Sequence, residues 1–147
     1  MNPKISWQVK ETDESFTLCK TYDDTSYVPG EYITKTIRVW NNYYGTEDVA
    51  NAKDCTLVVA FKNFEDSFLL RLTEVSIDEG EFKPLELDID KGVIPIGNLS
   101  GSANSGTNMN RSNFKDIELK IGPIPDNIKS ELKSIYFYLE YLSEEIR

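Results

Sequence analysis

The pattern of apolar and polar positions predicts a chain built from short β-strands. The longest alternation runs from Cys55 to Phe82. In its first part, Cys55 to Phe61, the residues Leu57, Val59 and Phe61 fall on one side of an extended chain. Because successive side chains of a strand point to opposite faces, this pattern predicts a strand that is buried on at least one face.

Two further strands are predicted within the same stretch. A polar break at 62–66 precedes a second alternation at 67–75, which predicts a hairpin with a loop of about five residues. A turn at 78–81 then leads into a third strand at 82–89. A three-stranded meander with one apolar face needs a second layer, which the flanking sequence is expected to supply.

The flanking sequence carries similar patterns. Strands are predicted at 5–10, 15–20, 31–41, 114–121 and 134–142, and a short apolar run covers 93–96. Loops are predicted at 22–26 and 41–48, and a longer segment rich in serine, glycine and asparagine at 97–113. Asp126 is a candidate N-cap for one short helix that places Ile128 and Leu132 on one face.

Together these elements predict an all-β fold. Many short strands, frequent turn signals and almost no helix are typical of an antiparallel β-sandwich of jelly-roll or Greek-key type, with at most one short helix. A length of 147 residues is usual for one domain, so a single domain over 1–147 is expected.

Charge and composition narrow the classes of partner. With 16 basic and 25 acidic side chains the net charge is −9, which disfavours nucleic acid and anionic membrane surfaces. The N-terminus has no apolar core of a signal peptide, and no segment approaches the ~20 apolar residues of a membrane span. We therefore expect a protein made and folded in a cytoplasm, with neither nucleic acid nor membrane as its partner.

The inventory of reactive side chains predicts a protein that is not an enzyme. Histidine is absent, which excludes Ser-His-Asp and Cys-His sites and histidine-containing zinc sites. Cys19 and Cys55 lack metal-like spacing and are expected to be reduced thiols, although Lys20 and Lys53 leave a lowered thiol pKa open. No catalytic residue, metal ligand or cofactor site is predicted.

Acidic residues offer two candidate sites that the spacing does not favour. Glu86, Asp88 and Asp90 precede Gly92, but a calcium loop requires glycine directly after the third acid and a glutamate at its twelfth position. These acids fit the solvated face of a strand better. The pairs at 23–24 and 65–66 offer candidate glycosidase carboxylates, yet a chain with 25 acids will always contain such pairs.

The aromatic residues at the end of the 31–41 strand are the best candidate for a contact site. Trp40, Asn41, Asn42, Tyr43 and Tyr44 bring flat rings and amides together, as a sugar-binding platform or a protein interface requires. The alternative is structural: Trp40 lies in the core of the second sheet and the tyrosines cover its rim.

Several segments resemble small tail-region proteins of siphophages that infect Gram-positive bacteria, and a baseplate-region protein of a Bacillus siphophage above all. The segments are 35–42, 65–70, 99–101, 104–106 and 124–141, so the resemblance covers most of the chain from about Glu31 onward. It implies a β-sandwich like the shoulder domain of lactococcal phage receptor-binding proteins. No ligand residue carries over, because the resemblance includes no site motif.

The resemblance also implies a working partner. The expected function is that of a tail or baseplate structural or adaptor protein, which binds other tail-tip or baseplate proteins in the virion tail. Receptor-binding proteins of this kind carry a coiled neck and a separate head, and this chain has neither, which favours the adaptor role. The alternative is a carbohydrate-binding module that recognises host cell-wall polysaccharide through Trp40, Tyr43 and Tyr44.

Overall fold

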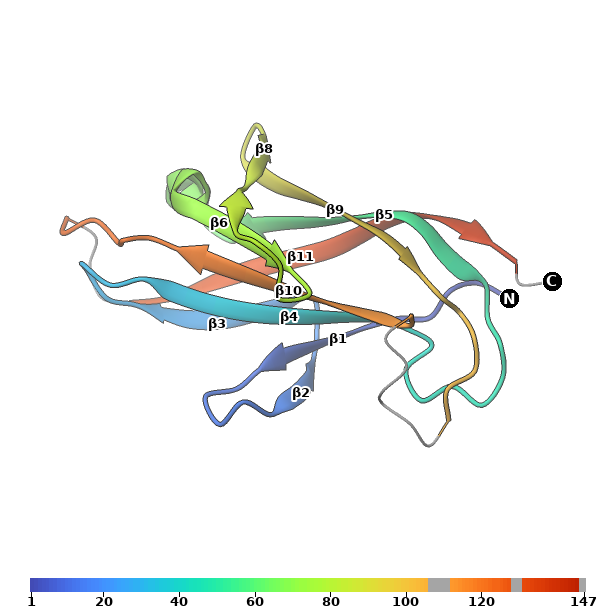
Figure 1. Ribbon diagram of the computed structural model, residues 1–147. Coiled ribbons are helices and arrows are strands. Elements are labelled where there is room, and N and C mark those ends of the chain that lie inside the picture. The colour runs from blue at the N-terminus through green and yellow to red at the C-terminus, as the bar shows by residue number, and fades with distance from the viewer. Residues whose placement is uncertain (106–111, 128–130, 146–147) are drawn as a thin grey trace.

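The computed structural model, which describes residues 1–105, 112–127 and 131–145, confirms the predicted β-sandwich of two antiparallel sheets (Figure 1). The first sheet has the strand order β2 (Phe16–Cys19), β1 (Ile5–Lys10), β4 (Ile33–Asn41), β10 (Phe114–Ile121), β6 (Thr73–Ile77), β7 (Lys83–Pro84). The second has the order β3 (Tyr22–Tyr27), β11 (Glu131–Glu144), β5 (Asn51–Phe61), β9 (Lys91–Leu99), β8 (Glu86–Asp88). One 3₁₀-helix, η1 (Phe64–Leu72), connects β5 to β6.

The core lies between the inner faces of the two sheets. Ile37 of β4 and Ile117 of β10 are fully buried in it, as is Leu57 of β5. The ring centroids of Trp7 on β1 and Phe137 on β11 lie 4.9 Å apart, which joins the sheets directly. Burial of each such side chain contributes roughly 1.5–3 kcal/mol, so the strands are held mainly by packing across the sandwich.

The strands with clear alternation form where the pattern predicts them. Those predicted at 5–10 and 114–121 are β1 and β10 with these bounds, and those at 15–20, 31–41 and 134–142 correspond to β2, β4 and β11. The predicted loop at 22–26 is wrong, because this segment forms the edge strand β3, paired with β11. Its polar side chains show no alternation, but an edge strand needs only backbone pairing on one side.

The predicted meander is also wrong. Leu69 and Leu70 belong to η1 and are buried, and the following strand β6 pairs with β10 of the first sheet instead of β5. Within η1, Asp66 is buried and accepts a 2.8 Å hydrogen bond from Lys133 Nζ. Burial of two adjacent leucines and this ion pair favour a turn of helix over the extended chain, so the chain changes sheet here.

Two further predicted elements, the strand at 82–89 and the helix from Asp126, differ from the structure. The strand predicted at 82–89 divides into β7 and β8, which belong to different sheets, and only Leu85 of its apolar positions is buried. The helix predicted from Asp126 is wrong, since 126–127 form a turn and β11 begins at Glu131. Ile128 lies outside the described residues.

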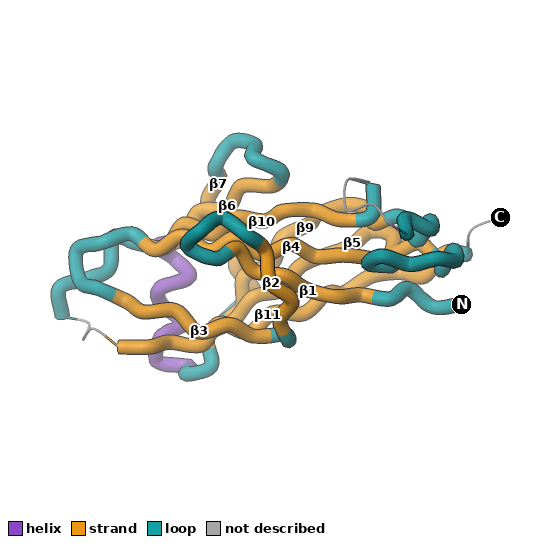
Figure 2. The backbone as a smooth tube through the Cα atoms, turned by 90° about the horizontal axis from the view of Figure 1, so that it is seen from below, coloured by secondary structure: helices purple, strands orange, loops and turns teal. Residues whose placement is uncertain are grey.

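The two ends of the sandwich differ in what they carry. The helix η1 lies at one end, and both chain termini lie at the other (Figure 2). At the terminal end the Met1 ammonium group lies 2.8 Å from Glu145 Oε1. The loops 42–50 and 100–105, with the start of β10, complete this terminal end, and the first of them contains Asn42, Tyr43 and Tyr44 of the predicted contact site.

Gly101 shows how tightly the terminal end is packed. A Cβ atom at this position would lie 2.1 Å from the carbonyl oxygen of Val49 and 2.4 Å from that of Ala50. Both contacts are with backbone, and Val49 N donates a 2.8 Å hydrogen bond to the Gly101 carbonyl. The two loops therefore meet only because residue 101 has no side chain.

We predict that Gly101→Ala lowers the free energy of unfolding by roughly 2–3 kcal/mol, because the added methyl group must separate the two loops. Urea denaturation followed by tryptophan fluorescence measures this change. Ser105→Ala, at an exposed position of the same loop, is the control and is expected to change stability by less than about 0.5 kcal/mol. Equal stability of the two variants would contradict the close packing.

Candidate binding surfaces

Trp40 lies on the outer face of the first sheet and is 1% exposed. Its ring centroid lies 4.5 Å from that of Phe114 and 4.9 Å from that of Tyr43, and its Nε1 donates a 2.6 Å hydrogen bond to Gln8 Oε1. The prediction that Trp40 presents a flat ring to a ligand is therefore wrong. The ring is buried, as the structural alternative proposed, but outside the core cluster that joins the two sheets.

Asn41 and Asn42 are also buried, and their side chains hydrogen-bond to the backbone of neighbouring loops. Asn41 Oδ1 accepts a hydrogen bond from Lys4 N, and its Nδ2 donates to the carbonyl of Ala50 at 3.0 Å. Asn42 Nδ2 donates to the carbonyl oxygens of Glu47 at 2.8 Å and Gly101 at 2.9 Å. Their amides satisfy backbone groups of Lys4 and of the loops at 47–50 and 100–105, so they are unavailable as ligand contacts.

Two asparagines that sequence reasoning did not single out complete this network. Asn104 Nδ2 donates to the Asn42 carbonyl at 2.6 Å, and Asn113 Nδ2 donates to that of Ser100 at 2.8 Å. Both are buried, with exposures of 4% and 0%. No sequence signal separates them from the other polar residues of the 97–113 segment.

The exposed part of the predicted site is the pair of tyrosines. Tyr44 is 43% exposed, Tyr43 is half-buried, and their ring centroids lie 4.6 Å apart. Beside them the Arg38 guanidinium lies 3.7 Å from the Phe16 ring centroid and binds Asp116 through two hydrogen bonds of 2.6 and 2.9 Å. This arrangement seals Trp40 from solvent.

A polar groove continues from these rings along the outer face of the first sheet. It consists of two adjoining hollows of about 290 and 390 Å³ that share the residues Lys10, Glu14, Thr36 and Glu118. Phe16 and Arg38 form part of the same lining. Hydroxyl, carboxylate and aromatic groups thus occur together here, in a groove that Tyr43 borders at one end.

An apolar patch lies at the opposite end of the molecule, where η1 meets the β8–β9 turn. Phe64, Phe68, Leu87 and Ile89 are 75%, 39%, 40% and 92% exposed, and they line a groove of about 400 Å³. We refer to these four residues as the apolar patch. Sequence alternation instead predicts that Leu87 and Ile89 face inward, which the structure contradicts.

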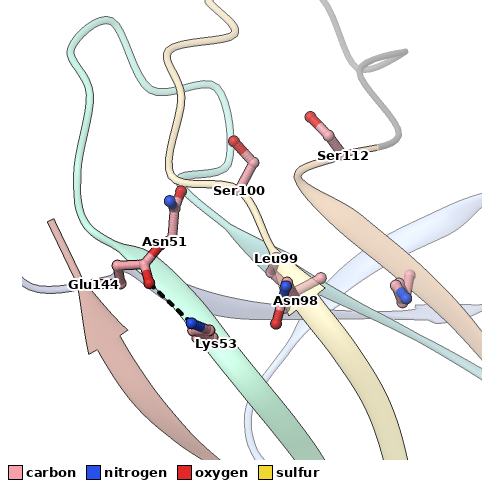
Figure 3. Close-up of a pocket in the computed structure, with 8 residues that line it drawn as sticks. Asn51, Lys53, Asn98, Leu99, Ser100, Ser112 and Glu144 are labelled. Atoms are coloured by element: carbon pink, nitrogen blue, oxygen red, sulfur yellow. Dashed lines mark hydrogen bonds and ion pairs between the residues drawn. The ribbon is translucent and has the colours of Figure 1, made fainter. Parts of the chain in front are cut away.

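A separate pocket, of about 290 Å³, lies near the chain termini (Figure 3). It is lined by Asn51, Lys53, Asn98, Leu99, Ser100, Ser112, Lys115 and Glu144. Lys53 Nζ and Glu144 Oε2 lie 3.2 Å apart across it, joining β5 to β11 (Figure 3). We call it the terminal pocket. None of its residues was a sequence-predicted site residue.

The candidate acids and cysteines of the sequence do not form a reactive cluster within the part of the chain that the structure describes. Asp23 pairs with Lys35, Asp24 accepts a hydrogen bond from Ser134, and no group of three acidic or cysteine side chains is arranged to hold a metal ion there. Both thiols are free, and burial raises the pKa of Cys19 and of Cys55 to about 11. The nearby lysines therefore do not activate them.

Comparison with known proteins finds one similar solved structure and no matching family. No protein-family model matches the sequence, and no curated protein matches it. A solved structure titled "AvmM Catalyzes Macrocyclization in Alchivemycin A Biosynthesis" is similar over 92% of this chain and 93% of its own, with 10% identity and a TM-score of 0.37. Within the described residues, no helix is long and apolar enough to cross a membrane.

The similar structure corrects one expectation from the sequence. Its title describes a catalyst, which stands against the expectation that this chain is not an enzyme, and we do not retain that expectation. We carry over no activity, substrate or residue, because a TM-score of 0.37 and 10% identity establish no shared chemistry. The functional argument therefore depends on the surfaces of this chain.

We predict that the free energy of unfolding falls as the pH rises from 9 towards about 11. The native Cys55 thiol keeps its proton to about pH 11 because it is buried, whereas an ordinary thiol loses it near pH 9. Stability from this thiol is therefore fully present below pH 9 and is lost as the pH passes through the native pKa. Urea denaturation at pH 8 and pH 10.5 measures the fall.

Cys55→Ala is the control for this pH dependence. Burial also raises the pKa of Cys19 and of Tyr27, so the variant keeps part of the alkaline loss and removes only the contribution of Cys55. The same fall in the variant and in the natural protein would contradict the assignment to Cys55.

Proposed function

We propose that this protein is a tail or baseplate component of a siphophage, and that it acts as a structural or adaptor subunit through protein–protein contacts. The observation that supports the proposal is the apolar patch. Large exposed apolar side chains that lie together around a groove mark interaction sites more often than scattered single ones do. The resemblance of the sequence to phage tail-region proteins supplies the kind of partner.

Ile89 is the centre of the argument, because its position is costly in two ways. It is 92% exposed, and its φ of 57° lies in the left-handed region, where a β-branched residue is a rare outlier. Asp88 pairs with Lys91, so Ile89 and Asp90 form a two-residue hairpin loop, and such loops favour glycine where φ is positive. The strain costs about 1–2 kcal/mol, which folding alone does not require.

The charges around the patch indicate the chemistry of the partner. Glu65 and Asp90 line the groove together with Arg71, in a chain whose net charge is −9. A partner that places an apolar segment in the groove and basic side chains near the rim fits this arrangement, because opposite potentials steer association.

We predict that the double substitution Phe64→Ser with Ile89→Gly reduces capture of tail or baseplate proteins at least tenfold. Tagged protein incubated with lysate of phage-infected cells, followed by mass spectrometry of what is retained, measures capture. Ile89→Gly alone should keep or raise the midpoint of thermal unfolding, because glycine removes the strain at positive φ.

Leu18→Ser is the matched control. Leu18 is 61% exposed on β2, at a distance in sequence from η1 and the β8–β9 turn, so its loss should leave capture unchanged. If no tail or baseplate protein is retained by the natural protein, or if the double variant retains it equally well, the proposal fails.

Carbohydrate recognition is a second candidate, supported by the polar groove beside Tyr43 and Tyr44. Thr36 and Glu118 offer hydrogen-bonding groups there, and Phe16 offers an aromatic edge, which is the combination that sugars require. This candidate differs from the one drawn from sequence, because the buried Trp40 contributes no ligand contact.

If the groove binds host cell-wall polysaccharide, Thr36→Val with Glu118→Gln should reduce sedimentation with purified cell walls at least tenfold while the fold is retained. Trp40→Ala is unsuitable as a test, since truncation of a buried tryptophan costs about 3–5 kcal/mol and disturbs the whole face. Leu18→Ser again serves as the control, and sedimentation unaffected by the double variant would exclude the groove.

A further inference from the structure

Lys115 occupies an inward-facing position of the sandwich. It shares a face of β10 with Ile117, Leu119 and Ile121, which are all buried. Its side chain is half-buried in the terminal pocket, and a Cβ atom at Gly97 would lie only 3.2 Å from its Nζ. Because this lysine occupies a core position of the strand, its ammonium group lies in the pocket and not in open solvent.

The Lys115 ammonium has no protein partner among the residues that the structure describes. No carboxylate lies within ion-pair distance of its Nζ, and no oxygen accepts a hydrogen bond from it. This is unusual in a chain with 25 acidic and 16 basic side chains. A half-buried charge without a partner is costly, so a partner from outside the chain would be bound favourably.

Two asparagines add further donor groups to the lining of the same pocket. Asn98 Oδ1 accepts a 2.9 Å hydrogen bond from Asp54 N, and Asn51 Oδ1 accepts one of 2.8 Å from Gly101 N. Because each oxygen is fixed by a backbone N–H, the orientation of each amide is defined by its contacts. Both Nδ2 groups are left without an acceptor within the described part of the chain, and both residues line the pocket.

Lys53 adds a second cation, which is held by a weak internal partner. Its ion pair with Glu144 is 3.2 Å long, and the two side chains are 46% and 51% exposed. Exposed pairs of this kind contribute at most about 1 kcal/mol. Because this pair is exposed and weak (Figure 3), we expect an oxyanion of higher charge to displace the Glu144 carboxylate from Lys53.

We propose that the terminal pocket is a binding site for a phosphate group, held by Lys115 and Lys53 with the side-chain amides of Asn51 and Asn98. Two ammonium groups match the charge of a phosphate monoester, which is about −1.5 to −2 at neutral pH. Two amide donors supply directed hydrogen bonds to its oxygens. The volume of about 290 Å³ leaves room for the group to which the phosphate is attached.

This site is separate from the surface that supports the proposed function. The apolar patch is formed by η1 and the β8–β9 turn, whereas the terminal pocket lies near the chain termini. Figure 2 shows η1 and the two termini at opposite ends of the sandwich. Failure of phosphate binding therefore leaves the capture of tail proteins untouched, and failure of capture leaves the pocket untouched.

The test is a titration of the purified protein with inorganic phosphate, and with acetate in parallel, at constant ionic strength set by sodium chloride. Side-chain amide signals in ¹H–¹⁵N spectra give the readout, since those of Asn51 and Asn98 should shift and saturate with phosphate. Glycerol phosphate should give the same shifts if an ester is the ligand. Acetate should bind at least tenfold more weakly, because one negative charge matches only one lysine.

Asn98→Asp tests the contribution of the Asn98 amide donor most directly. It keeps the oxygen that accepts from Asp54 N and replaces the donor in the pocket by a negative oxygen, so phosphate binding should weaken at least tenfold while the loop is retained. Lys115→Met should have the same effect on binding and keep or raise the thermal midpoint, because it removes a half-buried charge.

Lys62→Met is the matched control. Lys62 is exposed after β5, outside the terminal pocket, and its loss should leave the titration unchanged. Shifts that do not saturate, or that are equal in Lys115→Met, Asn98→Asp and Lys62→Met, would overturn the proposal. Equal affinity for acetate and phosphate would overturn the assignment of the ligand as phosphate.

Discussion

The packing of two apolar sheet faces against each other is the constraint on which the rest of this structure depends. Neither sheet can keep Ile37, Ile117 or Leu57 from water alone, so the strands must be divided between two layers. From β4 onward the chain changes sheet repeatedly, mostly at the two ends of the sandwich and, between the edge strands β7 and β8, along its edge. The ends, and not the faces, therefore carry the less regular structure and most of the candidate binding features.

The core is covered in different ways at the two ends of the sandwich. At one end η1 buries Leu69 and Leu70, and the buried pair of Asp66 with Lys133 satisfies the charges that this helix brings inside. At the other end the side chains of asparagines replace missing backbone hydrogen bonds and join loops that are far apart in sequence. An apolar patch results at the first end and a pocket rich in hydrogen-bond donors at the second.

Both candidate sites consist of residues that are unfavourable for the free chain. Ile89 holds a conformation that glycine would adopt at lower cost, and Lys115 holds a charge at a core position without a partner among the residues that the structure describes. Each local cost is small against the burial between the sheets, so the fold tolerates it. Such local disagreement with the rest of the sequence is what a site for another molecule is expected to show.

The sequence by itself determined the all-β class and the bounds of the alternating strands, because period-two burial is a local property that each segment records independently. It did not determine which strands pair. The polar edge strand β3 and the short helix η1 depend on partners more than 60 residues away, such as Lys133 for Asp66. Local propensity carries no information about such contacts.

The same reason separates what was predicted of the sites from what was not. The sequence drew attention to Trp40 and its neighbours as aromatic and amide residues, but only the tertiary structure decided that Gln8 and Phe114 would cover the ring. The terminal pocket joins β5, β9, β10 and β11, and no spacing in the chain relates its members. The sequence gives the type of each residue, whereas the exposure of its side chain and its neighbours in space are decided only when distant strands pack together.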